Sequence, residues 1–311
     1  MLRILVSGAA GFIGSHLCER LTDDGHFVVG VDNFMTGAGE NLRELARSER
    51  FQLVRGDVSQ PGWSIKDRFD AVLHLASLAS PREYLAHPLE TLETGSTGTR
   101  NLLEIARRED ARFLVTSTSE VYGDPAVHPQ REDYWGNVNP VGLRSCYDES
   151  KRFAEAMTMT YHRQFRLRTA IARVFNTYGP RMKTDDGRVV PQFIEQALKR
   201  QALTIYGDGS QTRSFCYVSD MAEGLVRLLW ADFAEPVNLG NPDERTILEF
   251  AQAVQNAVGT SLPIEYRDLP ADDPKRRKPD ISRARSVLDW EPRVSLEDGI
   301  RRTVDYFLAR R

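Results

Sequence analysis

The sequence has only three cysteines among its 311 residues, Cys18, Cys146 and Cys216. They lie far apart and form no CxxC pair, which argues against both a disulfide framework and a zinc site. The six histidines show no metal-ligand spacing, so we expect no bound metal. No apolar run approaches the roughly 20 residues that span a bilayer, and no basic leader precedes an apolar segment at the start. We therefore expect a cytoplasmic protein without a metal or a membrane anchor.

A strong excess of charge of either sign is also missing. Lys and Arg total 41 against 44 Asp and Glu, which gives a formal net charge of -3. No global basic field therefore favours a nucleic-acid partner, and an anionic ligand must be held by local cations. With 41% hydrophobic residues, the chain is long and apolar enough to bury a sizeable core.

Short apolar runs alternate with longer amphipathic stretches through the first half of the chain. This alternation predicts an α/β fold with a doubly wound parallel (Rossmann) sheet. Strands are expected at residues 4–6, 28–31, 51–54, 71–75 and 113–116. Helices are expected at residues 15–23, 89–108 and 148–164, and the last has an apolar stripe of Phe153, Met157 and Tyr161.

The alternation fades after about residue 175, where turn-rich stretches such as NTYGPRM and YGDGSQTRS interrupt short elements. We therefore expect the sheet domain in residues 1–175 and a smaller C-terminal α/β lobe in residues 176–311. Residues 170–175 and 237–239 are two later segments that can add strands to the main sheet.

A glycine cluster follows the first strand directly and opens a helix. Gly8, Gly11 and Gly14 are spaced as GxxGxxG, where the chain must turn tightly and approach a pyrophosphate closely. Phe12 and Ile13 lie inside the same turn. A plain structural turn is the alternative for this feature when it is taken alone.

The second predicted strand ends at Asp32, eighteen residues beyond Gly14. A carboxylate here accepts hydrogen bonds from an adenosine ribose and repels a 2′-phosphate, so it favours NAD over NADP. An ordinary Asp-Asn turn is the alternative. Further cofactor candidates follow the strands by position: Asn33, Asp57, Val58, Leu75, Ala76, Ser77 and Thr94.

Tyr147 and Lys151 are four residues apart at the start of a predicted helix, so their side chains share a face. We expect the lysine ammonium to favour the phenolate and to lower the pKa of the phenol, which makes the pair a general base. A surface Tyr and Lys are the alternative. The hydroxyl-rich segment TSTSEVYG, which begins at Thr116, favours the catalytic interpretation.

These motifs resemble the extended short-chain dehydrogenase/reductase family over nearly the whole chain, and most closely its UDP-glucuronate decarboxylase branch. The segments that carry the resemblance are GAAGFIGSH, VDNFMTG, HLAS, STSEVYGDP, HPQREDYWGNVNP, CYDESKR, ARVFNTYGPRM, DGRVVPQFI, YGDGSQTRSFCYVSD, NLGNP and RKPDI. The resemblance implies NAD-dependent conversion of UDP-glucuronate to UDP-xylose through a 4-keto intermediate, with NAD recycled in each turnover. Residues 1–175 then bind NAD, and residues 176–311 bind the nucleotide sugar.

The same resemblance implies roles for particular residues. Tyr147 removes the proton of the sugar 4-hydroxyl, Thr118 hydrogen-bonds the same oxygen, and Lys151 holds the cofactor ribose. Glu120 and Arg277 lie near the sugar C5 and its carboxylate, although Glu120 as a helix cap and Arg277 in a solvated loop are the alternatives. The remaining substrate contacts implied are Asn176 on a phosphate or sugar oxygen, Arg188 and Arg213 on the diphosphate, and Tyr206 near the uracil.

One departure from the family pattern is Gly95, which stands where related proteins usually carry an asparagine. If that asparagine supports the active-site backbone or a water, rate or cofactor order suffers here. The helices at 89–108 and 148–164 resemble a four-helix dimer interface, so a homodimer is expected. A UDP-sugar 4-epimerase, a sugar 4,6-dehydratase and a non-catalytic NAD-binding regulator remain as rival functions.

Overall fold

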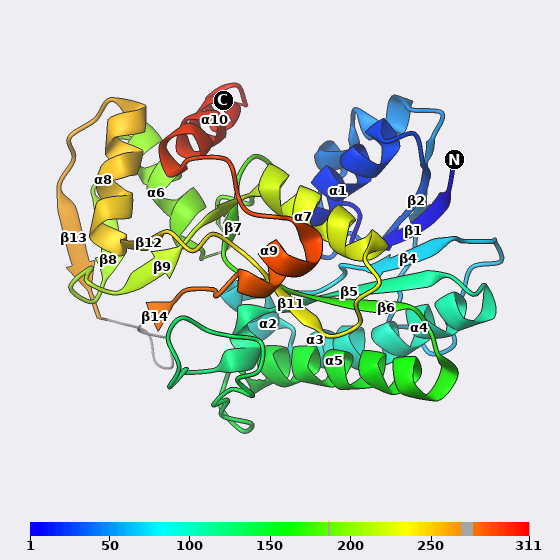
Figure 1. Ribbon diagram of the computed structural model, residues 1–311. Coiled ribbons are helices and arrows are strands. Elements are labelled where there is room, and N and C mark those ends of the chain that lie inside the picture. Colours follow the sequence, from blue (N-terminus) through cyan, green and yellow to red (C-terminus); the bar gives the residue numbers. More distant parts are fainter. Residues whose placement is uncertain (186, 269–275, 311) are drawn as a thin grey trace.

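A seven-stranded parallel sheet forms the centre of the computed structural model, which describes residues 1–185, 187–268 and 276–310 (Figure 1). Asp186, the first residue of the segment DGRVVPQFI, lies outside these residues. The strand order is β11-β6-β5-β4-β1-β2-β3. The strands are β1 (Arg3–Ser7), β2 (Phe27–Asp32), β3 (Phe51–Arg55), β4 (Ala71–His74), β5 (Arg112–Thr118), β6 (Thr169–Val174) and β11 (Pro236–Leu239).

The inner strands are buried on both faces, as near-continuous apolar runs in a parallel sheet require. In β1, Ile4, Leu5 and Val6 are all fully buried. The predicted doubly wound parallel sheet is therefore confirmed. The two later segments also join this sheet as β6 and β11, which pair with each other at its end.

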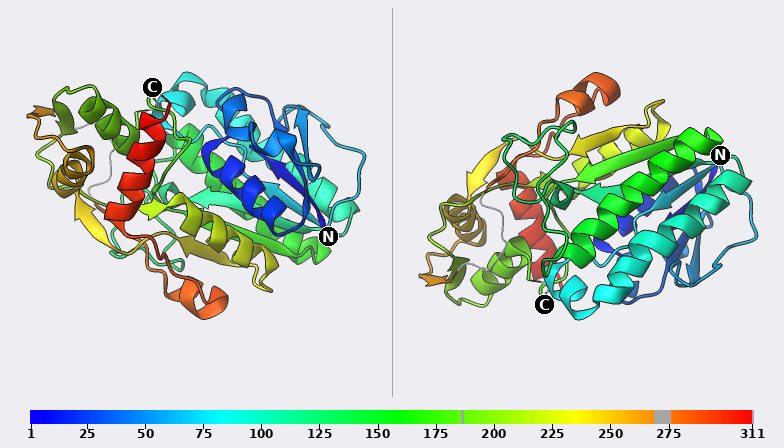
Figure 2. Two further views of the ribbon diagram at one scale, coloured as in Figure 1. Left: turned by 90° about the horizontal axis from the view of Figure 1, so that it is seen from above. Right: turned by 90° about the horizontal axis from the view of Figure 1, so that it is seen from below.

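Helices cover both faces of the sheet (Figures 1 and 2). One face carries α1 (Phe12–Asp23) and α7 (Val218–Trp230), and the other carries α4 (Thr99–Arg108) and α5 (Ser145–Phe165). The helix predicted for residues 89–108 is confirmed as one continuous helical run. Its parts are α3 (Pro88–Glu93), the π-helical turn η3 (Thr94–Gly98) and α4. A short helix, α2 (Pro81–Ala86), precedes them.

The smaller lobe has a core of its own. Phe193, Phe215 and Phe250 form its centre, with the rings of the last two 4.3 Å apart. Its helices are α6 (Val189–Leu198), α8 (Ile247–Val258) and α10 (Leu296–Leu308). Its short strands are β7 (Thr177–Tyr178), β8 (Leu203–Tyr206), β9 (Thr212–Ser214), β10 (Cys216–Tyr217), β12 (Glu244–Thr246), β13 (Ile264–Arg267) and β14 (Arg276–Arg277).

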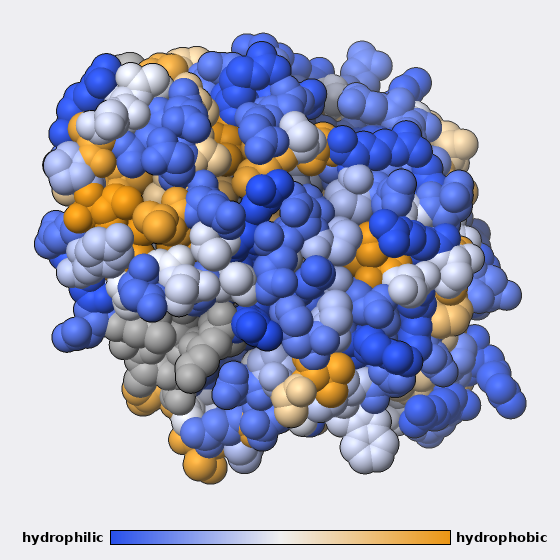
Figure 3. All heavy atoms as spheres, turned by 60° about the vertical axis from the view of Figure 1, so that its left-hand side comes forward, coloured by the Kyte–Doolittle hydropathy of each residue, from blue (hydrophilic) through white to orange (hydrophobic). Residues whose placement is uncertain are grey.

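The chain passes more than once between the two cores. Met221 and Leu225 of α7 and Ala284 of α9 (Ser282–Leu288) are buried in the core of the main sheet, although they follow residue 175. The division after residue 175 stays a prediction. On the side of the smaller lobe, apolar patches are separated by hydrophilic side chains (Figure 3). Among the described residues, no helix combines the length and apolar character needed to cross a membrane.

Candidate active site

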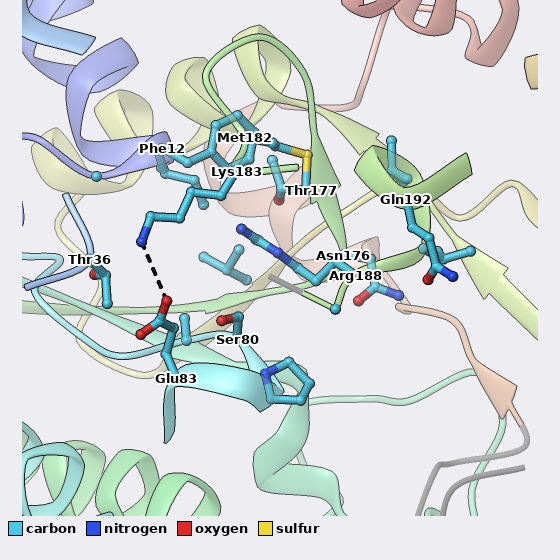
Figure 4. Close-up of a pocket in the computed structure, with 18 of the residues that line it drawn as sticks. Phe12, Thr36, Ser80, Glu83, Asn176, Thr177, Met182, Lys183, Arg188 and Gln192 are labelled. Carbon is cyan, nitrogen blue, oxygen red and sulfur yellow. Dashed lines mark hydrogen bonds and ion pairs between the residues drawn. The ribbon is translucent and has the colours of Figure 1, made fainter. Parts of the chain in front are cut away.

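A cavity of about 1090 Å³ lies at the carboxyl ends of the parallel strands, between the sheet and the smaller lobe (Figure 4). It is larger than the roughly 300–1,000 Å³ that is usual for one small ligand. This edge of an open parallel sheet is where such folds bind their ligands. The cavity therefore has room for a cofactor and a second molecule together.

The glycine turn forms one wall of the cavity. Gly8 has φ of 73°, and a Cβ atom added to it lies only 2.7 Å from the backbone nitrogen of Ala76. Helix α1 then begins at Phe12 with no side-chain cap and no acidic residue in its first turn. Gly11, Phe12, Ile13 and Gly14 all line the cavity. The free N–H groups of this helix start therefore present positive charge to a pyrophosphate.

Asp32 ends β2, as the sequence predicts, and its carboxylate is tied to the glycine turn. It accepts hydrogen bonds of 2.8 Å from the backbone N–H groups of Ala10 and Phe34. Burial nevertheless raises its pKa, because it disfavours the charged form. Nearby, Asp57 accepts hydrogen bonds from the N–H and hydroxyl of Ser59. Both carboxylates lie at the strand ends where an adenosine is expected.

The cofactor candidates divide into two groups. Those that line the cavity are Gly8, Gly11, Phe12, Ile13, Gly14, Leu75, Ser77, Tyr147 and Lys151. Those among the described residues that do not line it are Asp32, Asn33, Asp57, Val58, Ala76 and Thr94. Of the second group, Thr94 accepts a hydrogen bond through its carbonyl oxygen and Asn33 is exposed.

Tyr147, Lys151 and Thr118 come together where α5 passes the end of β5. The phenol of Tyr147 is hydrogen-bonded to the side chain of Thr118. Lys151 donates a 2.9 Å hydrogen bond from Nζ to the carbonyl oxygen of Thr116, and its Nζ lies 5.9 Å from the centre of the Tyr147 ring. Both helix residues are 6% exposed, so the alternative of a surface Tyr and Lys is wrong.

The expected lowering of the phenol pKa is not found in the protein alone. Burial raises the pKa of Tyr147, and the hydrogen bond from Thr118 offsets only part of this effect. Burial also lowers the pKa of Lys151 to about 8. The spacing of the two residues predicts the effect of the lysine charge, but it does not report the loss of water around both groups, which is the larger effect. In the protein alone, burial therefore favours the protonated phenol.

Glu120 and Arg277 form an ion pair beside this group. Arg277 is 2% exposed and donates to the carbonyl oxygen of Ser119 and, at 3.2 Å, to the carboxylate of Glu120. The same carboxylate oxygen accepts a 2.6 Å hydrogen bond from Arg144. Burial favours the neutral acid, but Arg277 and Arg144 together lower the pKa of Glu120. The alternative of a solvated loop for Arg277 is therefore wrong.

Arg144 and Tyr84 were missed by sequence reasoning, although both line the cavity. Arg144 lies three residues before Tyr147, so the i, i+3 spacing at a helix start was the signal for it. No comparable signal exists for Tyr84, because it comes from α2, far away in the sequence.

The four predicted substrate contacts, Asn176, Arg188, Tyr206 and Arg213, also line the cavity, on the side of the smaller lobe. The guanidinium of Arg188 lies 5.9 Å from the ring centre of Phe12, so it faces the cofactor wall (Figure 4). Arg213 is the register partner of Arg277 in the pairing of β9 with β14. These two cations therefore enter the site from adjacent strands.

Two ion pairs join the lobes at the mouth of the cavity. Lys183 contacts Glu83 of α2 at 3.3 Å, as Figure 4 shows, and Asp185 contacts Arg82 at 3.1 Å. Lys183 and Asp185 are therefore held against α2 at the wall of the cavity. Both pairs are at least partly exposed, so each adds little to stability on its own.

Comparison with known proteins places these residues in context. The model of the NAD dependent epimerase/dehydratase family matches residues 4–240. UDP-glucuronic acid decarboxylase 1 of Arabidopsis thaliana is 53% identical over 309 residues, covering 99% of this chain and 70% of the plant protein. UDP-glucuronic acid decarboxylase 1 of Danio rerio is 52% identical over 305 residues, covering 98% of this chain and 72% of the fish protein.

Solved structures share the fold at lower identity. The structure of UDP-glucuronic acid 4-epimerase from Bacillus cereus, in complex with UDP-glucuronic acid and NAD, has a TM-score of 0.89 to this chain. The two are 32% identical, and the comparison covers 100% of both chains. The decarboxylases are therefore nearer to this chain in sequence than this epimerase is.

Proposed function

This chain belongs to the NAD dependent epimerase/dehydratase family, and we propose that it converts UDP-glucuronate to UDP-xylose and carbon dioxide. One observation carries the proposal beyond the family. The buried Arg277 and the partly buried Glu120 and Arg144 form an ion-paired group beside Tyr147 and Thr118, where the carboxylated carbon of the sugar has to be held.

The residues at the glycine turn fit NAD. The uncapped start of α1 suits its pyrophosphate, and Asp32 at the end of β2 suits an adenosine ribose without a 2′-phosphate. Bound NAD supplies the chemistry of hydride acceptance from C4 and of its later return, so no cofactor is consumed in a turnover. Lys151 is placed to hold the nicotinamide ribose while its ammonium remains hydrogen-bonded to Thr116.

Tyr147 acts as the base on the sugar 4-hydroxyl, and Thr118 holds the same oxygen. The positive charge that enters with the oxidised nicotinamide opposes the effect of burial and favours the phenolate. The proton removed from the 4-hydroxyl is kept at the phenol oxygen and is returned to the same position when the ketone is reduced. The base is therefore regenerated with the cofactor.

Oxidation at C4 makes the C5 carboxylate a β-keto acid. Its carbon–carbon bond then breaks, carbon dioxide leaves, and the electron pair moves into an enolate that the 4-ketone stabilises. Arg277 and Arg144 are the cations available to orient the carboxylate before this step. Glu120 offsets part of their charge, so the two arginines orient the substrate carboxylate without strongly stabilising it against loss of neutral carbon dioxide. C5 of the enolate then takes up one proton, which water replaces, so each turnover consumes one proton from solvent.

The smaller lobe is suited to hold the UDP part. Arg188 and Arg213 present guanidinium groups that match diphosphate oxygens, and Asn176 lies beside Arg188. Tyr206 is 37% exposed at the far side of the cavity, where a uracil ring can stack on it. Binding energy from the nucleotide thus positions the sugar at Tyr147.

Three rival functions are less well supported. A 4-epimerase has to turn the keto sugar over instead of losing carbon dioxide, and the epimerase of known structure is 32% identical against 53% for a decarboxylase. A 4,6-dehydratase resembles this chain less, since that chemistry in the family uses an Asp-Glu pair where this chain has Ser119 and Glu120. A non-catalytic NAD-binding regulator has no need for Tyr147, Lys151 and Thr118 together.

Incubation with UDP-glucuronate and NAD tests the proposal. We expect UDP-xylose and carbon dioxide in equal amounts, measured by chromatography and trapped gas. The matched control is Tyr147→Phe, which keeps the ring and loses the base, so turnover should disappear while NAD stays bound. Formation of the 4-epimer of the substrate without carbon dioxide would instead assign the chain to the epimerases.

We also infer a homodimer, formed by the layer of α3 and α5. Leu89, Leu92 and Phe153 are 70%, 40% and 48% exposed on these two neighbouring helices (Figure 2). Such apolar side chains on one layer favour a partner surface. Light scattering in the micromolar range should give twice the chain mass, and the variant with Leu89→Glu and Phe153→Glu should give the mass of one chain.

We further propose a reducing, cytoplasmic location, which the three free, buried cysteines support.

A further inference from the structure

The π-helical turn Thr94–Gly98 lies directly against the helix that carries Tyr147 and Lys151. Gly95 is buried in this turn, and a Cβ atom added to it lies 2.6 Å from Cβ of Ser150 and 2.8 Å from the Ser150 carbonyl oxygen. Real Cβ atoms do not approach other atoms so closely. The contact between turn and helix is therefore possible only because residue 95 has no side chain.

Ser150 connects this contact to the site. It is 2% exposed, precedes Lys151 directly, and donates a 2.7 Å hydrogen bond from its hydroxyl to the carbonyl oxygen of Tyr147. The atoms that a side chain at position 95 would displace are thus the Cβ and backbone of α5 itself. They are not the flexible end of a long side chain, so the helix has to move.

The turn is fixed on its other side and has little room to retreat. Burial lowers the pKa of His74 to about 3, so this histidine is neutral. Its Nε2 lies 3.3 Å from the carbonyl oxygen of Thr94, which only accepts, so Nε2 carries the proton and Nδ1 accepts from Ser7 at 2.9 Å. Thr99 also donates to the Gly95 carbonyl oxygen at 2.8 Å.

We propose that Gly95 is a positioning residue, which sets how deeply the helix of Tyr147 and Lys151 sits against the sheet. A side chain at position 95 pushes α5 outward at Ser150. The outward shift lengthens the 2.9 Å hydrogen bond from Lys151 to Thr116 and moves Tyr147 away from Thr118.

The size of the effect follows from the geometry that catalysis requires. A displacement of about 1 Å at the reacting groups is enough to reduce a rate by about 100-fold. Lys151 also holds the NAD ribose in the proposed function, so cofactor affinity falls with the same shift. The expected effect on kcat rests on the proposed function. The expected effect on NAD affinity rests only on the binding of the cofactor that the family shares.

Gly95→Ala and Gly98→Ala form a matched pair in the same turn. A Cβ atom at Gly98 meets nothing closer than 3.4 Å, an ordinary contact with a methyl group of Val58. We expect Gly95→Ala to lower both NAD affinity and kcat by about 10-fold or more, and Gly98→Ala to change each by less than about 2-fold. UDP affinity, which depends on the smaller lobe, should be the same in both variants. Equal NAD affinities in the two variants would overturn the proposal.

Adding Ser150→Gly to Gly95→Ala removes the shortest contact, so NAD affinity and kcat should partly recover. This double variant also carries the test if Gly95→Ala alone does not fold, since relief at Ser150 should then restore a soluble protein. A double variant no better than the single one would contradict the positioning role. If wild type releases no carbon dioxide but the NAD affinities differ as expected, the proposed function fails and the role of Gly95 stands.

Discussion

The ring of Tyr84 lies flat against the ring of Tyr147, with centroids 5.0 Å apart and planes 10° from parallel. Tyr84 comes from α2 and is 1% exposed, and its hydroxyl oxygen has no hydrogen-bond partner among the described residues. The stack fixes the plane in which the proposed catalytic phenol can lie. The contribution of the ring stack to catalysis can therefore be measured separately from the effect of the Tyr84 hydroxyl on stability.

Tyr84→Leu should lower kcat by about 3- to 10-fold, since an aromatic stack contributes about 0.5–1.5 kcal/mol beyond its buried area. Tyr84→Phe keeps the stack and removes a buried hydroxyl that the protein does not satisfy, so its melting temperature should be equal or higher. Steady-state kinetics and thermal unfolding measure the two effects. Equal kcat values for the Leu and Phe variants would show that the stack does not position Tyr147.

Asp32 should show two separable roles in binding NAD. Asp32→Ala and Asp32→Asn both remove the charge that excludes a 2′-phosphate. Both variants should therefore bind NAD more weakly and should show a smaller ratio of NAD affinity to NADP affinity. Only the alanine variant loses every acceptor for the N–H groups of Ala10 and Phe34, so only it should lower the melting temperature clearly. Fluorescence titrations with both cofactors check this. Unchanged affinities in both variants would remove Asp32 from the adenosine site.

Arg277 separates decarboxylation from the oxidation step that the whole family shares. If it holds the substrate carboxylate, Arg277→Gln should weaken UDP-glucuronate by about 10- to 150-fold, the equivalent of a charge-assisted pair worth roughly 1.5–3 kcal/mol. UDP and UDP-glucose should be affected much less. Lysine at this position should recover only part of the loss, because a point charge cannot reproduce a planar two-point contact.

The control for this titration is Arg276→Gln, the exposed neighbour on the same short strand, which should bind all three ligands like wild type. Equal weakening of all three by Arg277→Gln would assign this residue to the diphosphate. Loss of Arg277 also removes one of the two arginines that form ion pairs with Glu120 among the described residues, so a lower melting temperature is expected in the glutamine variant.

Asp148 should make stability depend on pH in an unusual direction. Burial, followed by repulsion from Glu120, raises the pKa of its carboxyl to about 7. Between roughly pH 4 and pH 7 the folded protein therefore holds a proton that the unfolded chain has released, so stability falls as pH rises. From pH 5 to pH 8, Asp148→Asn should gain on the order of 2 kcal/mol relative to wild type.

Urea unfolding at the two pH values measures this difference for the asparagine variant and for Thr160→Ala. Thr160 is exposed on the same helix and carries no titratable group, so its variant should keep a constant difference from wild type. A constant difference for Asp148→Asn as well would show that its carboxyl is already ionised at pH 5.

Local sequence signals were sufficient for the elements of the cofactor site. Gly8 and Gly14 have to be glycine because backbone atoms occupy the space of their side chains, and Asp32 has to end the second strand to reach the turn. Tyr147 and Lys151 share a face because of their spacing alone. Each of these constraints acts within a short stretch of chain or between adjacent strands, so residue type and spacing are enough to predict it.

Tertiary contacts account for what the sequence did not reveal. The pKa of Tyr147 depends on how much water the surrounding lobes exclude, which no spacing reports. The close approach of Gly95 to Ser150, more than 50 residues away in the sequence, is likewise a tertiary contact that no local pattern reports. Arg144 and Arg277 come together at Glu120 only through the tertiary contact between the smaller lobe and the sheet domain.

The place of β11 at the end of the main sheet limits how this protein can be divided. A fragment that stops after residue 175 keeps β6 but loses β11, so the backbone N–H and C=O groups of β6 become an open edge. It also loses α7 and α9, which cover apolar side chains of that region. The two ligand-binding halves are therefore not modules that can be expressed or exchanged separately, and the first half produced alone should aggregate.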